Sequence, residues 1–388
     1  MINKNQEILA FIEEQKPNIL KDWQELVELE GSTLEKPKVE KTISKFQSWL
    51  EAEGFTCKVI DVGEQTAGTL IGMLGEERAG KPILFSGHLD TVYPEGTFEK
   101  EFQIVDGKAF GPGVLDMKGG LIIALYVVKA LRVLGYEDTP IKFIVSGDEE
   151  NGHQLSKGDD LFVEEAKNCL FGLNMETGRI DNKLCIGRKG VINALITVTG
   201  VGSHAGNDFE SGRNAITEMA HKVLLLHDLT DLEAGTTVNP GVIAGGTVIN
   251  ATPASCTLKV DVRYKSLDAA EKVVNEIKNI CKKTYIEGTS TEVKIIEALK
   301  SFETNDKVEK LLGFIQTIAA ETNHDVPGSV YLGGGSDAAY VGIAGTPAIC
   351  SIGVLGQWNH TQEEYAVVQS MFDRISLVTT VVLNQKTF

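Results

Sequence analysis

Histidine and carboxylate side chains recur in short polar segments that are spread along the chain. Five of them have the types that bind divalent metal ions: His88, Asp116, Glu150, Glu176 and His360. Imidazole with carboxylate suits zinc and its first-row neighbours, and the absence of cysteine from the set argues against a structural zinc site. A single catalytic zinc ion keeps only about three protein ligands. The set therefore fits two ions if one carboxylate bridges them, and Asp116 is the natural bridge.

The segment around Asp116 reads Gly-Pro-Gly-Val-Leu-Asp-Met-Lys-Gly-Gly, residues 111–120. It predicts a turn that leads into an apolar helix over 121–134. Glycine beside a carboxylate lets the backbone approach a bound group closely, since no side chain stands in the way. Capping of the helix is the more ordinary role for an aspartate here. The other metal-type residues favour the role of ligand.

Two further carboxylates stand beside these ligands. Glu149 precedes Glu150 and is expected to project differently, so it is the candidate general base. Asp90 follows His88 by two residues and is expected to accept a hydrogen bond from the second ring nitrogen, which would fix the tautomer. The alternative is that residues 148–150 form a solvated acidic turn, because runs of charge usually face solvent. Each histidine taken singly also fits an ordinary loop or core position.

The stretches before these side chains predict an α/β sheet. Apolar, β-rich runs at 82–86, 141–146 and 170–175 alternate with helical patterns at 121–134 and 159–167. The side chains that come after the three runs are His88, Glu149, Glu150 and Glu176. Sites in such sheets lie outside the carboxyl ends of the strands. Residues far apart in sequence are therefore expected to converge at one edge.

Near residue 190 the pattern changes to that of a second domain. Strands are predicted at 191–199, 245–251, 255–264 and 291–296, and helices at 214–229 and 267–281. This order, β-α-β-β-α-β, is the split βαβ or ferredoxin-like arrangement. We expect a catalytic α/β domain made of residues 1–189 and 303–388, with residues 190–302 inserted as a smaller α+β domain.

Composition narrows the range of partners. The chain has 388 residues and a net charge of −17, which argues against nucleic acid or an anionic membrane as partner. Six scattered cysteines without a C-x-x-C pair are typical of free thiols in a reducing compartment. The first residues lack the pattern of a signal peptide, and no apolar run is long enough to span a bilayer. A cytoplasmic protein is expected.

The order of the polar segments resembles that of the M20 metallopeptidase family, from about residue 80 to 365. The segments are H-L-D at 88–90, G-P-G-V-L-D-M-K-G-G at 111–120, D-E-E-N-G at 148–152, M-E-T at 175–177, G-S-H-A-G at 202–206, G-G-G-S-D-A at 333–338 and N-H at 359–360. G-R-K-G at 187–190 and D-V-R-Y at 261–264 most resemble the glutamate carboxypeptidase branch. M-E-T replaces the E-P-T usual in that branch, and H-T-Q replaces H-S-D, but neither change removes a ligand.

The resemblance implies a zinc-peptidase-like fold and a role for each matching residue. His88 and Glu176 would hold one zinc ion, Glu150 and His360 a second, with Asp116 as bridge and Glu149 as base; Co²⁺ or Mn²⁺ are alternative metals. The Asp116–Met117 bond would be cis. The inserted domain would be a lid that also forms a homodimer and brings His204 to the partner subunit's site, where it would stabilise the oxyanion. Residues implied near the substrate carboxylate are Asn250, Arg263, Gly334, Gly335 and Ser336. Arg263 could instead be an exposed strand residue that is paired on the surface of the lid.

The expected function is a dinuclear zinc hydrolase that cleaves an amide bond next to a free carboxylate, including release of a C-terminal glutamate. Its substrate would be a small peptide or an N-acyl-amino acid. An N-acyl-amino-acid deacylase or a di- or tripeptidase with the same metal residues is the first alternative. A catalytically inactive, metal-binding dimeric protein is the second. Retention of Glu149 and His204 argues against the second, because a binding protein needs no base.

Overall fold

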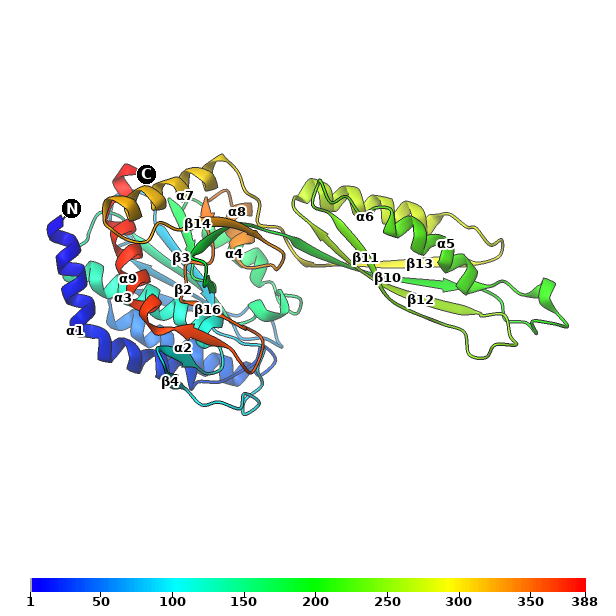
Figure 1. Cartoon of the computed structure of the whole chain (residues 1–388), viewed down its shortest axis with the longest axis horizontal. Helices are drawn as coiled ribbons and strands as arrows, with labels where there is room; N and C mark the ends of the chain where they lie inside the picture. The colour runs from blue at the N-terminus through cyan, green and yellow to red at the C-terminus, as the bar shows by residue number, and fades with distance from the viewer. Residues whose placement is uncertain (1) are drawn as a thin grey trace. The chain divides into compact units, whose positions relative to one another are not determined.

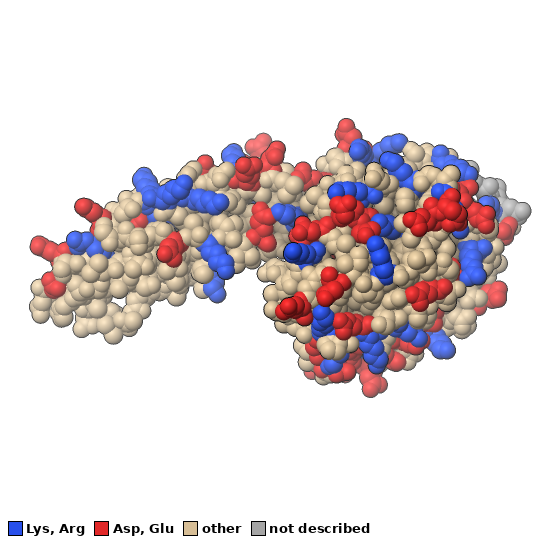
Figure 2. All heavy atoms as spheres, turned by 180° about the vertical axis from the view of Figure 1, so that it is seen from behind, with Lys and Arg blue, Asp and Glu red and all other residues tan. Residues whose placement is uncertain are grey.

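The computed structural model describes residues 2–388, with side chains from Lys4 onward, and the chain divides into two units. Unit 1 comprises Met1–Gly187, Thr304–Tyr331 and Ser336–Phe388, and unit 2 comprises Arg188–Glu303 and Leu332–Gly335. No helix among the described residues is long and apolar enough to cross a bilayer. On the face drawn in Figure 2, acidic and basic side chains are interspersed over both units. That face therefore presents no broad basic field of the kind that nucleic acids bind.

A six-stranded sheet forms the centre of unit 1, in the order β1-β2-β6-β3-β7-β15. The strands are β1 Thr56–Ile60, β2 Thr69–Leu74, β6 Ile141–Ser146, β3 Ile83–His88, β7 Phe171–Asn174 and β15 Ala348–Ile349. β6, β3, β7 and β15 are parallel, while β1 and β2 pair antiparallel at one edge. Every residue of β3, β6 and β7 is buried, as their continuous apolar runs predict for central parallel strands.

Helices cover both faces of this sheet (Figure 1). They are α1 Ile2–Val27, α2 Lys36–Ala52, α3 Gly119–Val133, α4 Gly158–Ala166, α7 Asp306–Glu321, α8 Ala338–Ile343 and α9 Val368–Leu383. Phe143 of β6 packs against Phe46 of α2, whereas the neighbouring Lys142 pairs with Glu165 of α4. Because successive side chains of a strand point to opposite faces, α2 and α4 lie on opposite sides. α3 is buried along almost all of its length and packs against α1 and α9.

Short strands outside the main sheet hold the loops of unit 1. A five-stranded sheet has the order β4-β5-β17-β16-β8, and β9 pairs with β14. The strands are β4 Gln103–Val105, β5 Lys108–Phe110, β8 Gly178–Arg179, β9 Lys183–Arg188, β14 Gly328–Leu332, β16 Leu355–Gln357 and β17 Tyr365–Val367. Most have only two or three residues, too few for a hydrophobic period to reveal them. β16 and β17 fix both ends of the loop that carries His360.

Unit 2 has the ferredoxin-like order that the sequence predicts. Its elements are β10 Gly190–Thr199, α5 Ala215–His227, β11 Thr237–Gly245, β12 Ser255–Tyr264, α6 Leu267–Lys282 and β13 Ser290–Leu299. The sheet is antiparallel throughout, in the order β11-β12-β10-β13. Alternate residues of β10 and β12, including Ile196 and Val260, form a core with α5 and α6. Short helical turns at Phe209–Ser211 in unit 2 and Gln385–Thr387 in unit 1 complete the chain.

One predicted strand is wrong. The run at 245–251 predicts a paired strand, but β11 occupies Thr237–Gly245 and ends where that run begins. The β-branched Val248 and Ile249 favour a strand by propensity, yet they are 58% and 104% exposed and pair with nothing in β12. Pro240 hides the true strand, since proline interrupts a strand pattern. The pairing of β11 with β12 accommodates the proline through a shift in register between Pro240 and Val242.

Gly120 tests how closely α3 packs against the backbone that follows β7. A Cβ atom on Gly120 would collide with the backbone oxygen of Met175. We expect Gly120→Ala to lower the free energy of unfolding of unit 1 by about 1–3 kcal/mol. Tryptophan fluorescence during urea unfolding measures this, because Trp23, Trp49 and Trp358 all belong to unit 1.

Gly313→Ala is the matched control. Gly313 lies within α7, and a Cβ atom there would meet nothing within 4 Å. Alanine at such a helical position is expected to add about 0.5–1 kcal/mol to the free energy of unfolding. Equal stability of the two variants would contradict the close approach at Gly120.

Candidate metal centre

The parallel strands of unit 1 deliver four of the predicted residues to one edge of the sheet. His88 is the last residue of β3, and Glu176 stands two residues after β7. Glu149 and Glu150 open a short helical turn, Glu149–Asn151, that comes after β6. Parallel neighbours end at the same edge, so these side chains meet there although up to 88 positions separate them.

Asp116 enters this edge from the turn before α3. The turn spans Val114–Lys118, and Gly113 before it adopts a left-handed backbone with φ of 71°. The Asp116–Met117 peptide bond is cis, as the family resemblance implied. Asp116 and Met117 depart from helical geometry, which directs the aspartate away from the helix. His360 completes the centre from the loop between β16 and β17.

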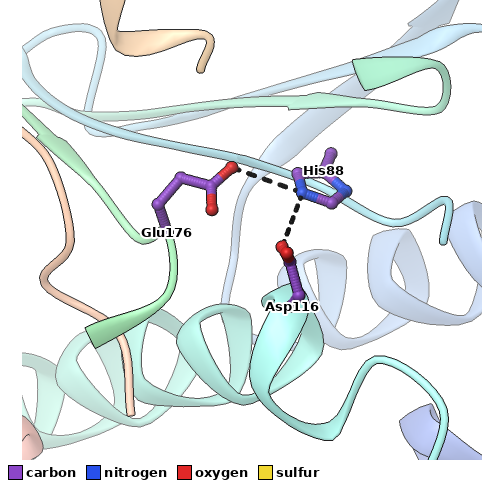
Figure 3. A group of neighbouring side chains, drawn as sticks. All are labelled: His88, Asp116 and Glu176. Atoms are coloured by element: carbon purple, nitrogen blue, oxygen red, sulfur yellow. Dashed lines mark ion pairs between the residues drawn. The ribbon is translucent and has the colours of Figure 1, made fainter. Parts of the chain in front are cut away.

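The five side chains form two groups that share Asp116. In the first, His88 Nε2 lies 3.4 Å from Asp116 Oδ1 and 3.3 Å from Glu176 Oε1 (Figure 3). In the second, His360 Nε2 lies 3.2 Å from Asp116 Oδ2 and 3.1 Å from Glu150 Oε2. Each oxygen of Asp116 thus faces a different imidazole. Figure 3 shows His88 between the carboxylates of Asp116 and Glu176.

The donors of this centre fit metal ions. The Nδ1–H of His88 donates to the backbone carbonyl of Asp90 at 3.0 Å, which directs the lone pair of Nε2 toward Asp116 and Glu176. Nε2 of His88 and Oε1 of Glu150 are buried, and neither has a hydrogen-bond partner among the described residues. Buried polar atoms without partners cost free energy. Because these two atoms belong to groups that share the Asp116 carboxylate, the arrangement is typical of a cation site. Nitrogen and oxygen donors of this kind suit zinc, cobalt or manganese.

The carboxylates perturb each other strongly at this edge. Burial alone would raise the pKa of Asp116, but the nearby imidazoles of His360 and His88 lower it well below its usual range. Asp116 and Glu150 in turn raise the pKa of His360 to about 11. Burial and the nearby charge of Asp116 raise the pKa of Glu150 to about 7. Excess negative charge around Asp116 is the electrostatic environment that a divalent cation stabilises.

Glu149 lies beside the first group without belonging to it. Its Oε2 is 3.9 Å from His88 Nε2, and its side chain is 11% exposed. Burial raises the pKa of Glu149 well above its usual range, and the nearby charges of Glu176 and Asp337 add to this effect. A carboxylate with a raised pKa next to a cluster of ligands has the properties of a general acid–base group.

Asp90 holds the turn that carries Glu149 and Glu150. Its carboxylate accepts hydrogen bonds from the backbone N–H groups of Glu149 and Glu150, at 3.2 and 3.1 Å, and from Thr33 Oγ1 at 2.6 Å. The carboxylate is 3.4 Å from His88 Nδ1, farther than the backbone carbonyl of the same residue. At His88 the backbone carbonyl of Asp90 thus takes the place that the sequence predicted for its carboxylate. The carboxylate instead holds the acidic turn, a contact that the sequence did not predict.

Glu364 is a residue of this centre that the sequence analysis missed. Its buried carboxylate accepts hydrogen bonds from the backbone N–H groups of Leu115 and Asp116, at 2.9 and 3.0 Å, and from Tyr93 at 3.0 Å. Burial and the charge of Asp116 raise the pKa of Glu364 to about 8. Asn359, which the sequence analysis quoted in the N-H segment without giving it a role, donates to Asp116 Oδ2 at 2.9 Å. Both lie within five positions of His360 in the sequence. Closeness to this predicted ligand was the signal by which their roles could have been found.

A second missed group lies behind the acidic turn. His153 donates from Nδ1 to Asp148 and from Nε2 to Asp337, both at 2.8 Å, and Asp337 also accepts from Ser146 at 2.9 Å. Burial would lower the pKa of His153, but the two carboxylates raise it well above its usual range. A buried imidazolium thus joins the end of β6 to the start of α8. No spacing pattern in the sequence connects residues that lie 184 positions apart.

Most of the predicted substrate-binding residues belong to unit 2. His204 Nδ1 accepts hydrogen bonds from the backbone N–H groups of Gly206 and Asn207, and Asn250 is exposed. Arg263 pairs with Asp261 on its own strand at 2.9 Å, in agreement with the alternative interpretation of this residue. The carbonyl groups of Gly334 and Gly335 accept from Arg188. Ser336 belongs to unit 1, where its Oγ accepts from the backbone N–H of Ala338.

Comparison with known proteins agrees with this architecture. Residues 186–289 match the family model described as "Peptidase dimerisation domain" of M20 proteins. Carboxypeptidase G2 of Pseudomonas sp. (strain RS-16) is 30% identical over 382 residues, which cover 96% of this chain and 90% of that protein. The chain belongs to the M20 family of metallopeptidases. Like its relatives, this M20 protein is an enzyme that acts on peptide or acyl amide bonds.

Other M20 members resemble the chain more distantly. Succinyl-diaminopimelate desuccinylase of Caulobacter sp. (strain K31) is 26% identical over 363 residues, covering 87% of this chain and 89% of that protein. The crystal structure of aminopeptidase PepT from Bacillus cereus ATCC 10987 superposes with a TM-score of 0.81 at 21% identity, covering 95% and 98% of the two chains. That likeness shows the M20 fold, with its catalytic α/β unit and inserted domain.

The role of Glu364 in holding the Asp116 turn leads to a prediction. Glu364→Ala removes the acceptor of two backbone N–H groups and is expected to weaken metal affinity by about 10–100-fold. Competition with a chromophoric chelator measures this affinity.

Glu364→Gln is the matched control. Its amide oxygen still accepts from both N–H groups, so affinity close to that of the wild type is expected. If the alanine variant also binds metal as the wild type does, Glu364 does not position Asp116.

Proposed function

We propose that this enzyme is a dinuclear zinc hydrolase of an amide bond next to a free carboxylate. The observation that carries the proposal is the sharing of Asp116 between two imidazole–carboxylate groups. His88 and Glu176 would hold one ion and Glu150 and His360 the other, with Asp116 between them. When bound, paired ions supply Lewis-acid chemistry, because together they make water more acidic and polarise a carbonyl oxygen.

Glu149 would move the proton in this reaction. Its Oε2 faces the first group from 3.9 Å and is the acceptor placed to take a proton from the attacking water. The same oxygen would then return the proton to the leaving amine nitrogen, so that the carboxylate is regenerated after each turnover. Asp90 supports this role by fixing the backbone of Glu149 and Glu150, and His88 is held by the carbonyl of the same residue.

Unit 2 would supply the remaining functions. Because residues 186–289 match a peptidase dimerisation domain, we propose a homodimer formed through unit 2. His204 would stabilise the oxyanion in the partner subunit's site. Asn250, Arg263 and the 334–336 loop would bind the substrate carboxylate. To bind the substrate carboxylate, Arg263 would break its ion pair with Asp261.

The substrate class is inferred from the relatives. The similarity to carboxypeptidase G2 favours carboxypeptidase activity, with release of a C-terminal residue such as glutamate. The desuccinylase and the aminopeptidase favour the alternative, an N-acyl-amino-acid deacylase or a small-peptide peptidase with the same metal residues. Small peptides or N-acyl-amino acids are the proposed substrates in each case.

Glu149→Ala tests the proposed activity. The zinc-loaded wild type is expected to hydrolyse at least one member of a panel of N-acyl-glutamates, dipeptides ending in glutamate or alanine, and N-acetyl- and N-succinyl-amino acids. The variant should lose at least about 100-fold in kcat because the proton acceptor is gone. Amine release measures the rate, and elemental analysis checks that the metal content is unchanged. Full activity of the variant would contradict the role of Glu149, and an inactive wild type with its metals bound would favour the binding-protein alternative.

Metal stoichiometry tests the two-ion proposal separately. His88→Ala and His360→Ala each remove one imidazole from a different group and are expected to lower the zinc content from two ions per chain to about one. Inductively coupled plasma mass spectrometry after gel filtration gives the count. His324→Ala is the control, because His324 bonds to Thr322 and Ser376 and is not part of either group. A wild type that binds a single ion would refute the bridging role of Asp116.

A further inference from the structure

The loop that carries His360 is exposed and strained. His88 is the last residue of the buried strand β3 and its side chain is 1% exposed, whereas the side chain of His360 is 50% exposed. Trp358 and His360 both adopt left-handed backbone conformations, with φ of 68° and 62°. Bulky residues rarely take this conformation, because their Cβ atoms crowd the backbone. Contacts with other segments are therefore needed to hold the imidazole of His360 in place.

Gln362 connects this loop to residues 94–99, a segment between β3 and β4 that we call segment 94–99. Its Oε1 accepts a hydrogen bond from the backbone N–H of Glu99 at 2.8 Å, and its Nε2 donates to the backbone carbonyl of Thr97 at 3.0 Å. A side-chain amide offers an acceptor and a donor side by side, so it can pair with a backbone in this way. Both ends of the Gln362 amide are thus used to join the two loops.

Tyr93 makes a second connection between the same loops. Its hydroxyl lies 2.9 Å from the backbone carbonyl oxygen of Thr361, the residue directly after His360. Its ring packs edge-on against Phe98 of segment 94–99, with 4.8 Å between the ring centroids. Tyr93 and Phe98 are each 7% exposed, so this connection is buried. The chain after His360 is therefore held at two successive residues.

Two glutamates between α1 and α2 fix the opposite side of segment 94–99. Glu35 Oε2 accepts a hydrogen bond from the backbone N–H of Glu95 at 3.0 Å, and Glu30 Oε2 accepts from that of Gly96 at 2.7 Å. Hydrogen bonds from neighbouring groups lower the pKa of Glu35 to about 2, so this carboxylate is charged at neutral pH. Hydrogen bonds to a charged acceptor are stronger than those between neutral groups. Segment 94–99 is thus anchored on the side away from Gln362.

We propose that Gln362 is a positioning residue for His360, with segment 94–99 as the support against which it holds the loop. Its two side-chain hydrogen bonds go to that segment, so it acts on His360 through the backbone of the shared loop. The inference rests on the proposed two-ion centre, in which His88 and His360 belong to different ions. Gln362 then affects the ion of His360 alone, because strand β3 holds His88. A general loss of stability would not distinguish the two ions.

Zinc affinity measured one ion at a time tests this assignment. His88→Ala is expected to retain the ion of His360, and His360→Ala the ion of His88, so each variant reports on a single ion. Adding Gln362→Ala is expected to weaken zinc binding at least about tenfold in the His88→Ala protein and less than about twofold in the His360→Ala protein. Competition with a chromophoric chelator gives each affinity. Equal losses in the two proteins, or no loss in either, would overturn the proposal.

Gln369→Ala is the matched control in the His88→Ala protein. Gln369 also donates from its side-chain amide, to Asp373 at 2.9 Å, but this exposed bond stays within α9. Zinc affinity equal to that of His88→Ala alone is therefore expected. A loss as large as that caused by Gln362→Ala would refute a specific role for Gln362.

Hydrogen exchange tests the connection between the loops without metal. In the metal-free, full-length protein, Gln362→Ala is expected to speed amide exchange about tenfold in peptides that cover 94–101 and 357–364, while peptides of β3 and α3 are unchanged. If His88→Ala binds no zinc, the two-ion proposal fails and this measurement still decides whether Gln362 holds the loop. Unchanged exchange in both segments would refute the role of Gln362.

Discussion

The shared carboxylate of Asp116 is the interaction on which the rest of unit 1 depends. Its two oxygens face His88 and His360, and Glu150 and Glu176 stand against the same imidazoles. Buried carboxylates repel one another, so the fold must compensate each of them with donors or with a cation. Backbone N–H groups donate hydrogen bonds to the carboxylates of Asp90 and Glu364. The imidazolium of His153 donates to those of Asp148 and Asp337. The side chains of the two candidate metal groups are those that a bound cation would compensate.

The sequence predicted the parts of this arrangement that depend on local pattern. Continuous apolar runs before His88, Glu149 and Glu176 are the pattern of buried parallel strands, and parallel strands place the residues at their carboxyl ends along one edge. Geometry of this kind depends on chain direction alone. The ferredoxin-like order of unit 2 was predictable for a similar reason, since β12 alternates buried and partly exposed residues along its length.

The parts that the sequence did not predict depend on distant contacts or on very short elements. Glu364 reaches the backbone of Leu115 from 249 positions away, and His153 reaches Asp337 from 184 positions away. No periodicity records such pairs. Strand β11 was misplaced because Pro240 interrupts its pattern while the exposed residues after Gly245 imitate one. Tertiary pairing, here with β12, determined the outcome instead of local propensity.

The metal centre is built from residues on both sides of unit 2 in the sequence. His88, Asp116, Glu150 and Glu176 precede the insertion, whereas His360, Asn359 and Glu364 come after it. The later residues supply a candidate ligand and the acceptor that fixes the Asp116 turn, and Asp337 neutralises His153 behind the acidic turn. Without them, the carboxylates of Asp116, Glu150 and Glu176 would face a single imidazole. The acidic edge is therefore compensated only when the segment after residue 303 is packed onto the sheet.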